Sequence, residues 1–335
     1  MRLQRNHFAL LFSYCFKNCC HQQSFCRKKT GFETYLFLYW LQEFSCGAQQ
    51  TISMNIIENK EFEGERPLFY MKDLSLHKIR VLNGESAIKE CSNVFCQDSS
   101  FNGKYPFWHA NHAKIEKCTF ETGARAAVWY SKDLSMQNSL INAPKMFRRC
   151  NGLQLENLEF SDALETLWDC TDIKASGIKA VHGDYIFMNS SDIEVENFEL
   201  HGNYSFQNCS NVSIKNSILE TKDAFWEARN VTVENCTITG EFLGWHSENL
   251  TLVNCKIKGT QPLCYAKNLR IINCTFDEDC DLAFEYSSLT ADIKGHVTSI
   301  KNPLSGRIKV GSVGEIISDA NAKAPHNCVI EIANE

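Results

Sequence analysis

Polar and apolar residues alternate in short runs along most of the chain, and the runs return at a nearly constant interval. The strings RNVTVENCTITG at Arg229, ENLTLVNCKIKG at Glu248 and KNLRIINCTFDE at Lys267 align without a gap. Period-two alternation with β-branched residues predicts short strands, each half-buried. The first apolar residue of each run marks twelve units at separations of 19 to 21 residues: Leu74, Val94, Ala113, Leu134, Leu153, Ile173, Ile193, Val212, Val231, Leu250, Leu269 and Leu289.

A repeat of this length made of strands, with only six prolines in the chain, predicts coils that stack in parallel. The expected fold is all-β: a single-stranded right-handed parallel β-helix of about twelve coils of 19–21 residues. The expected organisation is an N-terminal cap at 54–73, the repeats at 74–289, and a C-terminal cap and tail at 290–335. Residues 1–53 carry no repeat and are expected to be an extension that is disordered or precedes the native start.

Equal positions of successive coils lie above one another, so the repeat also predicts columns. An asparagine ladder is expected in the column Asn138, Asn157, Gly177, Asn197, Asn216, Asn235, Asn254 and Asn273. A second polar column is Asp133, Gly152, Asp172, Asp192, Asn211, Asn230, Asn249 and Asn268. Both are interpreted as structural.

The seventeen cysteines also follow the repeat. Cys118, Cys236, Cys255 and Cys274 share a slot with Ser, Leu, Ile and Phe, and Cys91, Cys150, Cys170 and Cys209 share another with Ser and Ala. Free cysteine packs as a small hydrophobic residue, so we expect reduced cysteines in interior slots. Together with Asn-x-Ser/Thr sequons lying on the polar columns, this favours a cytoplasmic protein.

Composition removes several classes of function. Lys and Arg number 34 against 40 Asp and Glu, which leaves a net charge of −6 and no basic surface for nucleic acid. No apolar run reaches the roughly 18 residues of a membrane-spanning helix, so no membrane partner is expected. The glycine-rich phosphate loop, HExxH and GxSxG motifs are absent from the sequence, and neither a cofactor nor a metal is predicted.

Each coil carries an aromatic residue shortly before the next marker. These residues are Trp108, Trp129, Phe147, Trp168, Phe187, Phe206, Trp226 and Trp245, and we expect most of them to form a ladder in the core. A polar column lies a few residues earlier and changes from basic to acidic along the chain. In it Glu165 and Asp184 are expected in consecutive coils, with their backbones about 4.8 Å apart. Carboxylates roughly 5 Å apart suit a retaining glycosidase, and such proximity raises one pKa.

The candidate catalytic residues are therefore Glu165, Asp184 and Asp223. The candidate substrate-binding residues are Tyr185, Tyr204, Trp226, Glu241, Trp245, Arg149 and His246. The alternative interpretation is a solvated turn face whose opposite charges pair along the helix.

Ten ordered strings between about residues 61 and 317, among them KYPFW at Lys104, ETLWDC at Glu165, KDAFWE at Lys222 and GEFLGWHS at Gly240, resemble one known family. It is the right-handed β-helix family called domain of unknown function 3737, in the pectin-lyase-like superfamily. The resemblance implies the fold and no catalytic residues. Some members carry a hydrogenase label, which cysteines in packing slots do not support.

Two functional hypotheses of different class follow. In the first, the outer acidic and aromatic face binds or cleaves an oligosaccharide or polysaccharide, as a glycoside hydrolase or polysaccharide lyase would. In the second, the protein is a non-catalytic scaffold whose long face binds a partner protein or a second copy of the chain. Solenoid surfaces serve both purposes, and the fold does not choose between them.

Overall fold

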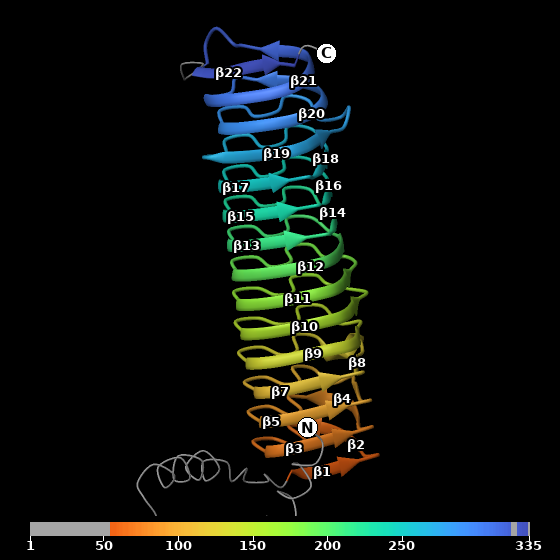
Figure 1. The fold of residues 1–335 in the computed structure, drawn as a ribbon. Helices are drawn as coiled ribbons and strands as arrows, with labels where there is room; N and C mark the ends of the chain where they lie inside the picture. The colour runs from red at the N-terminus through yellow and green to blue at the C-terminus, as the bar shows by residue number, and fades with distance from the viewer. Residues whose placement is uncertain (1–53, 323–326, 334–335) are drawn as a thin grey trace, which may run out of the picture. The chain divides into compact units, whose positions relative to one another are not determined.

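The computed structural model describes residues 54–322 and 327–333, so the N-terminal extension lies outside the described residues. The described residues form strands in a coiled stack, with one short 3₁₀-helix, η1 (Thr122–Ala124) (Figure 1). The strands are β1 (Asn55–Glu58), β2 (Glu61–Glu65), β3 (Lys72–His77), β4 (Arg80–Glu85), β5 (Ser92–Gln97), β6 (Ser100–Phe101), β7 (Asn111–Glu116), β8 (Thr119–Phe120), β9 (Lys132–Ile141), β10 (Asn151–Phe160), β11 (Thr171–Ala180), β12 (Ser191–His201), β13 (Ser210–Lys215), β14 (Ile218–Glu220), β15 (Arg229–Glu234), β16 (Thr237–Thr239), β17 (Glu248–Val253), β18 (Lys256–Lys258), β19 (Leu269–Phe276), β20 (Ser288–Lys301), β21 (Ser305–Ile317) and β22 (Asn327–Ile332).

All pairings between these strands are parallel, and each strand pairs with its equivalent one coil away. One line of pairing runs β1-β3-β5-β7-β9-β10-β11-β12-β13-β15-β17-β19-β20-β21-β22. A second line joins the shorter strands, such as β14-β16-β18. The predicted right-handed parallel β-helix is confirmed.

The first line of pairing contains fifteen strands, which are separated by fourteen turns, whereas about twelve coils were predicted. The marker residues lie in register as predicted, for example Leu74 with Val94 and Leu269 with Leu289. The additional coils have Asn55, Gly306 and Cys328 at the marker position. Because these residues are not the apolar ones that define the pattern, the repeat could not be followed to the ends of the stack. The segments expected as caps therefore contain strands of the same helix.

Left-handed backbone recurs at fixed positions of every coil. The eight residues of the column that begins at Asn138 have φ between 50° and 64°. Asparagine and glycine adopt this conformation at the lowest cost, which explains why they fill the column. The side chains also bond along the axis: Asn254 Nδ2 donates to Asn235 Oδ1 at 3.0 Å, and Asn273 Nδ2 donates to Asn254 Oδ1 at 2.6 Å.

The connection before each marker strand is a six-residue turn segment, of which 185–190 is an example. Its first, third and fifth residues have positive φ: Tyr185 at 62°, Phe187 at 63° and Asn189 at 57°. Their backbone N–H groups alternate in direction along the axis. Phe187 N donates to Thr166 O in the preceding coil at 3.0 Å, and Tyr185 N donates to Asn203 O in the following coil at 2.8 Å. The second, third and sixth side chains of these segments point into the core, and the first, fourth and fifth form a surface that we call the turn face.

The interior consists of stacked columns of like residues. Phe187 and Phe206, at the third position of consecutive turn segments, are buried with ring centroids 4.6 Å apart and planes 9° apart. The sixth position holds the small residues that were predicted to be internal, including Cys150, Cys170 and Cys209. The twelve cysteines of the described residues are free, and all but Cys328 are buried.

Two substitutions at Asn254 separate the cost of left-handed backbone from the loss of the side-chain hydrogen bonds. Alanine loses both amide bonds and must hold φ near 52°, whereas Asn254→Gly loses the bonds only. We expect the alanine variant to lower the free energy of unfolding by about 2 kcal/mol and the glycine variant by about 1 kcal/mol. Urea denaturation of the three proteins measures both. Equal losses would show that left-handed backbone is not what selects asparagine here.

Candidate functional site

The aromatic residues near the turns form two columns rather than the single core ladder predicted from the sequence. Phe147, Phe187 and Phe206 occupy the third position of their segments and are buried. The five described tryptophans occupy the fourth position and are only partly buried, on the turn face. The prediction was wrong for the tryptophans because alternate residues of these segments have positive φ, so side-chain direction does not follow simple alternation.

The tryptophan column is held rigidly for most of its length. Four indole N–H groups donate to backbone carbonyls at 2.5 to 2.8 Å, those of Trp108, Trp129, Trp168 and Trp245. The rings of Trp108 and Trp129 stack 5.2 Å apart, and those of Trp226 and Trp245 stack 5.5 Å apart. Within the described residues, Trp226 is the one tryptophan whose N–H has no acceptor.

The column is interrupted in two consecutive coils, where Met188 and Gln207 stand between Trp168 and Trp226. A surface hollow of about 490 Å³ lies at this interruption, and we call it the turn-face hollow. Its lining consists of Met188, Asn189, Tyr204, Gln207, Asn208, Asp223, Trp226 and Glu227. Three of the predicted residues, Tyr204, Asp223 and Trp226, are therefore brought together.

Asp223 is the least solvated charged group of the turn face. Its residue is 7% exposed, and its carboxylate has no hydrogen-bond or ion-pair partner among the residues described. Burial raises the pKa of Asp223, the nearby Lys222 opposes the rise, and Glu241 adds to it. Its oxygens are not among the fully buried atoms without a partner, so water reaches the carboxylate, and partial desolvation accounts for the raised pKa.

Glu165 is instead neutralised by two basic residues. Lys145 Nζ lies 2.9 Å and an Arg148 terminal nitrogen 3.0 Å from its carboxylate. Partial burial raises the pKa of Glu165, but the hydrogen bonds from Lys145 and Arg148 outweigh it, so the pKa lies below its ordinary value. A carboxyl group held in this way is unsuited to act as a general acid.

Arg148 itself occupies the tryptophan column. Its guanidinium carbon lies 4.6 Å from the centre of the Trp129 ring and 4.4 Å from that of Trp168. The cation is thus sandwiched between two indoles while it donates to Glu165. The arrangement stabilises the coils that precede the turn-face hollow, and the guanidinium covers one face of each indole.

Glu165 and Asp184 lie in consecutive coils with adjacent backbones, as predicted, since Glu165 N donates to Asp184 O at 2.9 Å, but their carboxylates do not form the predicted pair. Glu165 shares its position with Tyr185 in the next coil, because Asp184 lies one residue before the turn segment. The Asp184 carboxylate accepts a hydrogen bond from Asn203 N at 2.7 Å, toward the following coil, whereas Glu165 faces Lys145 in the preceding one. Coil lengths of 19 to 21 residues shifted the alignment by one position. The two side chains therefore point in opposite directions along the helix.

The other predicted residues surround the hollow or lie apart from it. Tyr185 stacks on Tyr204 at 4.8 Å, beside the hollow. Trp245 stacks on Trp226 from the following coil, and the ring centroids of His246 and Tyr265 stack 5.0 Å apart. Glu241 pairs with Lys222 at 3.3 Å. Arg149 lies several coils away, with its Nε 3.7 Å from Asp169.

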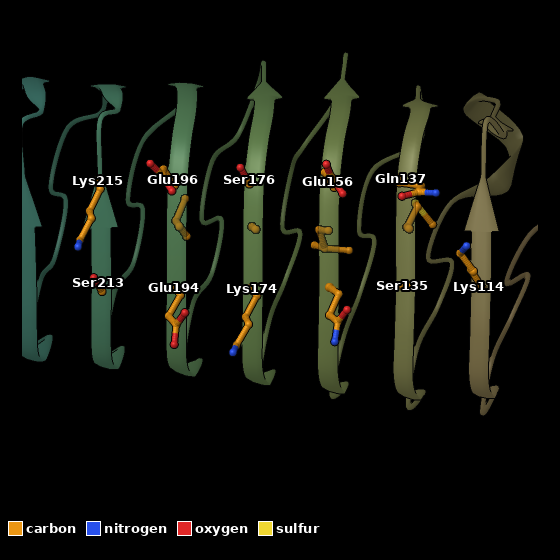
Figure 2. A pocket seen from close by; sticks show the side chains of 15 residues that line it. Lys114, Ser135, Gln137, Glu156, Lys174, Ser176, Glu194, Glu196, Ser213 and Lys215 are labelled. Carbon is orange, nitrogen blue, oxygen red and sulfur yellow. The ribbon is translucent and has the colours of Figure 1, made fainter. Parts of the chain in front are cut away.

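A second hollow, which sequence reasoning missed, lies on the outer face of β7 and β9 to β13 (Figure 2). We call it the sheet-face groove; its volume is about 700 Å³. Its charged lining consists of Lys114, Lys174, Lys215, Glu156, Glu194 and Glu196, and small residues such as Ser135 and Ser176 form its floor. The lining contains no aromatic ring, and its charges balance. Outward residues of a strand vary freely between coils, so no motif identified it.

The described residues contain no cluster of three or more His, Cys, Asp or Glu side chains arranged to hold a metal ion. No helix in the described part of the chain is long and apolar enough to cross a membrane.

The hollow residues that sequence reasoning missed are Met188, Asn189, Gln207, Asn208 and Glu227. The sequence feature that could have identified these residues is the interruption of the tryptophan column. To see it, the turn segments must be aligned in the correct register, so that the tryptophans fall in one column and the phenylalanines in another.

Comparison with known proteins gives one strong match. The family model described as "Protein of unknown function (DUF3737)" matches residues 55–331. No curated protein matches the chain significantly. Among solved structures, the chain is similar to the A-module of the mannuronan C-5 epimerase AlgE4 of Azotobacter vinelandii, with 10% identity, coverage of 84% of this chain and 91% of that chain, and a TM-score of 0.27. It is also similar to the periplasmic alginate epimerase AlgG, with 7% identity, coverage of 83% and 85%, and a TM-score of 0.25.

Glu165→Gln is expected to lower stability without affecting the turn-face hollow. Because the pKa of Glu165 is lowered in the folded state, its ion pairs stabilise the protein above the unfolded-state pKa, and this contribution is lost as the pH falls through the folded-state pKa. We expect a loss of about 1 kcal/mol near neutral pH that disappears in acid. Chemical denaturation across this pH range measures it. A loss that is independent of pH would contradict the ion-pair account.

Asp223→Asn is expected to have the opposite effect. The raised pKa of Asp223 means that ionisation of its carboxyl group destabilises the folded state, so wild-type stability falls as the pH rises from the unfolded-state pKa through the folded-state pKa. The variant, which has no charge to bury, should melt at a higher temperature near neutral pH and at the wild-type temperature in acid. Thermal melts followed by circular dichroism test this. A variant that melts lower at neutral pH would identify Asp223 as a structural residue.

Proposed function

The chain belongs to the DUF3737 family, and from its own geometry we propose that it binds carbohydrate in the turn-face hollow without cleaving it. The observation that carries the proposal is the interruption of the tryptophan column at Met188 and Gln207. From Trp108 to Trp168, and between Trp226 and Trp245, the fourth-position side chains stack on one another. At the interruption an indole ring borders an open hollow.

The groups around the hollow match what a sugar ring requires. One face of a sugar is made of C–H groups that pack on an aromatic ring, and its edge carries hydroxyls that need donors and acceptors. Trp226 supplies the ring and a free indole N–H, and Tyr204 supplies a second ring. Gln207, Asn208 and Asp223 supply amide and carboxylate groups. Apolar surface with a few convergent polar groups is the usual composition of a ligand site.

The dimensions support a small ligand or a short stretch of a longer chain. The hollow of about 490 Å³ lies within the range of small-molecule sites. It occupies a long, straight surface, so a polymer could extend past it along the turn face. The framework around it is rigid, since each coil is hydrogen-bonded to both neighbours, and little ordering is required on binding.

Binding without cleavage is favoured because, of the three candidate catalytic residues Glu165, Asp184 and Asp223, only Asp223 lines the hollow. Glu165 and Asp223 occupy the same turn position three coils apart, a distance of roughly 14 Å at about 4.8 Å per coil. Glycosidases place their two carboxylates roughly 5 to 9.5 Å apart. Glu165 is also held ionised by Lys145 and Arg148, so the acid that such chemistry needs is not available at this position.

A glycan array followed by titration calorimetry with the best ligand tests the proposal. Trp226→Ala should weaken binding at least about tenfold, because stacking on the indole and its free N–H are both lost. Trp108→Ala is the matched control: it lies in the same column but far from the hollow, and should leave the affinity unchanged.

Chromatography of the ligand after prolonged incubation with the protein should show chains of unchanged length. An array with no binding, or binding that Trp226→Ala and Trp108→Ala reduce equally, would overturn the proposed site. Shortened or modified chains would overturn the proposal that the protein only binds.

A further inference from the structure

We infer that the turn-face hollow selects a sugar that carries a free, positively charged amino group. This inference rests on the proposed function and names the class of carbohydrate that the same hollow takes. It follows from the charge of the lining, the state of Asp223, and the aromatic ring beside it.

The Asp223 carboxylate has no cationic side chain in direct contact with it among the described residues. Residue Asp223 as a whole is more than nine-tenths buried and lines the hollow, and its carboxylate, which water can still reach, has no hydrogen-bond or ion-pair partner within the described residues. The adjacent Lys222 is directed elsewhere: its Nζ lies 3.3 Å from Glu241 and 5.2 Å from the centre of the Phe242 ring. A ligand ammonium group would provide both the charge and the N–H donors that this carboxylate lacks.

The rest of the lining reinforces the preference for a cation. Glu227 is the other charged residue of the hollow, and neither lysine nor arginine contributes to the lining. Trp226 borders the same space, and an indole face attracts an ammonium group. A neutral sugar would satisfy the aromatic surface and the amides but would leave both carboxylates without a counter-charge.

The turn-face hollow differs in charge from two other surfaces of the protein. In the sheet-face groove three lysines face three glutamates, so the lining carries no net charge. In the coils below the hollow, Arg148 already occupies the space between two indoles and pairs with Glu165. The turn-face hollow has the same elements, an indole and a carboxylate, with the cation missing from the chain. In the turn-face hollow, a cation carried by the ligand would take the place that Arg148 has between the indoles of Trp129 and Trp168.

The test uses three tetrasaccharides with the same β-1,4 linkage that differ only at carbon 2: tetraglucosamine, tetra-N-acetylglucosamine and cellotetraose. Titration calorimetry is carried out slightly below neutral pH, where the free amines are largely protonated. We expect tetraglucosamine to bind roughly tenfold or more tightly than either neutral ligand. Its affinity should fall with rising salt concentration, because the interaction is between charges.

Asp223→Asn should remove the preference, bringing the ratio of the tetraglucosamine and cellotetraose affinities to about one. Asp184→Asn is the matched control, an acidic residue outside the hollow, and should keep the wild-type ratio. Circular dichroism of each variant verifies folding. If all three ligands bind equally and Trp226→Ala weakens each of them, the amine preference is wrong and the proposed function stands. If tetraglucosamine binds equally well to wild type and Trp226→Ala, or binds to neither, both proposals fail.

Discussion

The interaction on which the rest of the structure depends is the backbone hydrogen bonding between coils. Each coil must direct its N–H and C=O groups along the axis at every corner as well as in the strands. The chain meets this requirement with left-handed backbone at the same positions in successive coils, including bulky residues such as Phe187 and Tyr204. Such residues cost about 1 to 2 kcal/mol each in isolation. They persist because each is held from both sides by hydrogen bonds and by a like residue in the next coil.

This constraint also determines where a site can form. Side chains of equivalent positions stack at the coil spacing, so columns of like residues cover one another: phenylalanine on phenylalanine inside, indole on indole or on Arg148 outside. Where a column is complete, neighbouring side chains cover one another's faces and leave mainly their edges to solvent. We propose that the binding surface lies where a column is interrupted, at Met188 and Gln207, since there the flanking Trp226 and Asp223 lack the hydrogen-bond and ion-pair partners of Trp168 and Glu165. The proposed site is thus a local departure from the repeat.

Features that depend on the period of the repeat were predicted correctly from the sequence. Features that depend on the direction of a side chain were not. The marker residues, the core cysteines and the parallel fold follow from a spacing of about twenty residues. The outer tryptophans and the Glu165–Asp184 pair were misplaced, because alternating positive φ and variable coil length shift the turn segments by one residue. Tyr204, Asp223 and Trp226 were identified as a group by residue type. Their partners Gln207 and Glu227, and the entire sheet-face groove, depend on register and side-chain size, which no motif records.

We propose that ligand binds at the interruption of the tryptophan column and not in the larger sheet-face groove. A crystal structure of the protein with tetraglucosamine would locate the ligand. We expect a sugar ring stacked on Trp226 with its amine against the Asp223 carboxylate. A ligand seated on β9 to β12 in the sheet-face groove, or on the turn face with its amine directed away from Asp223, would contradict it.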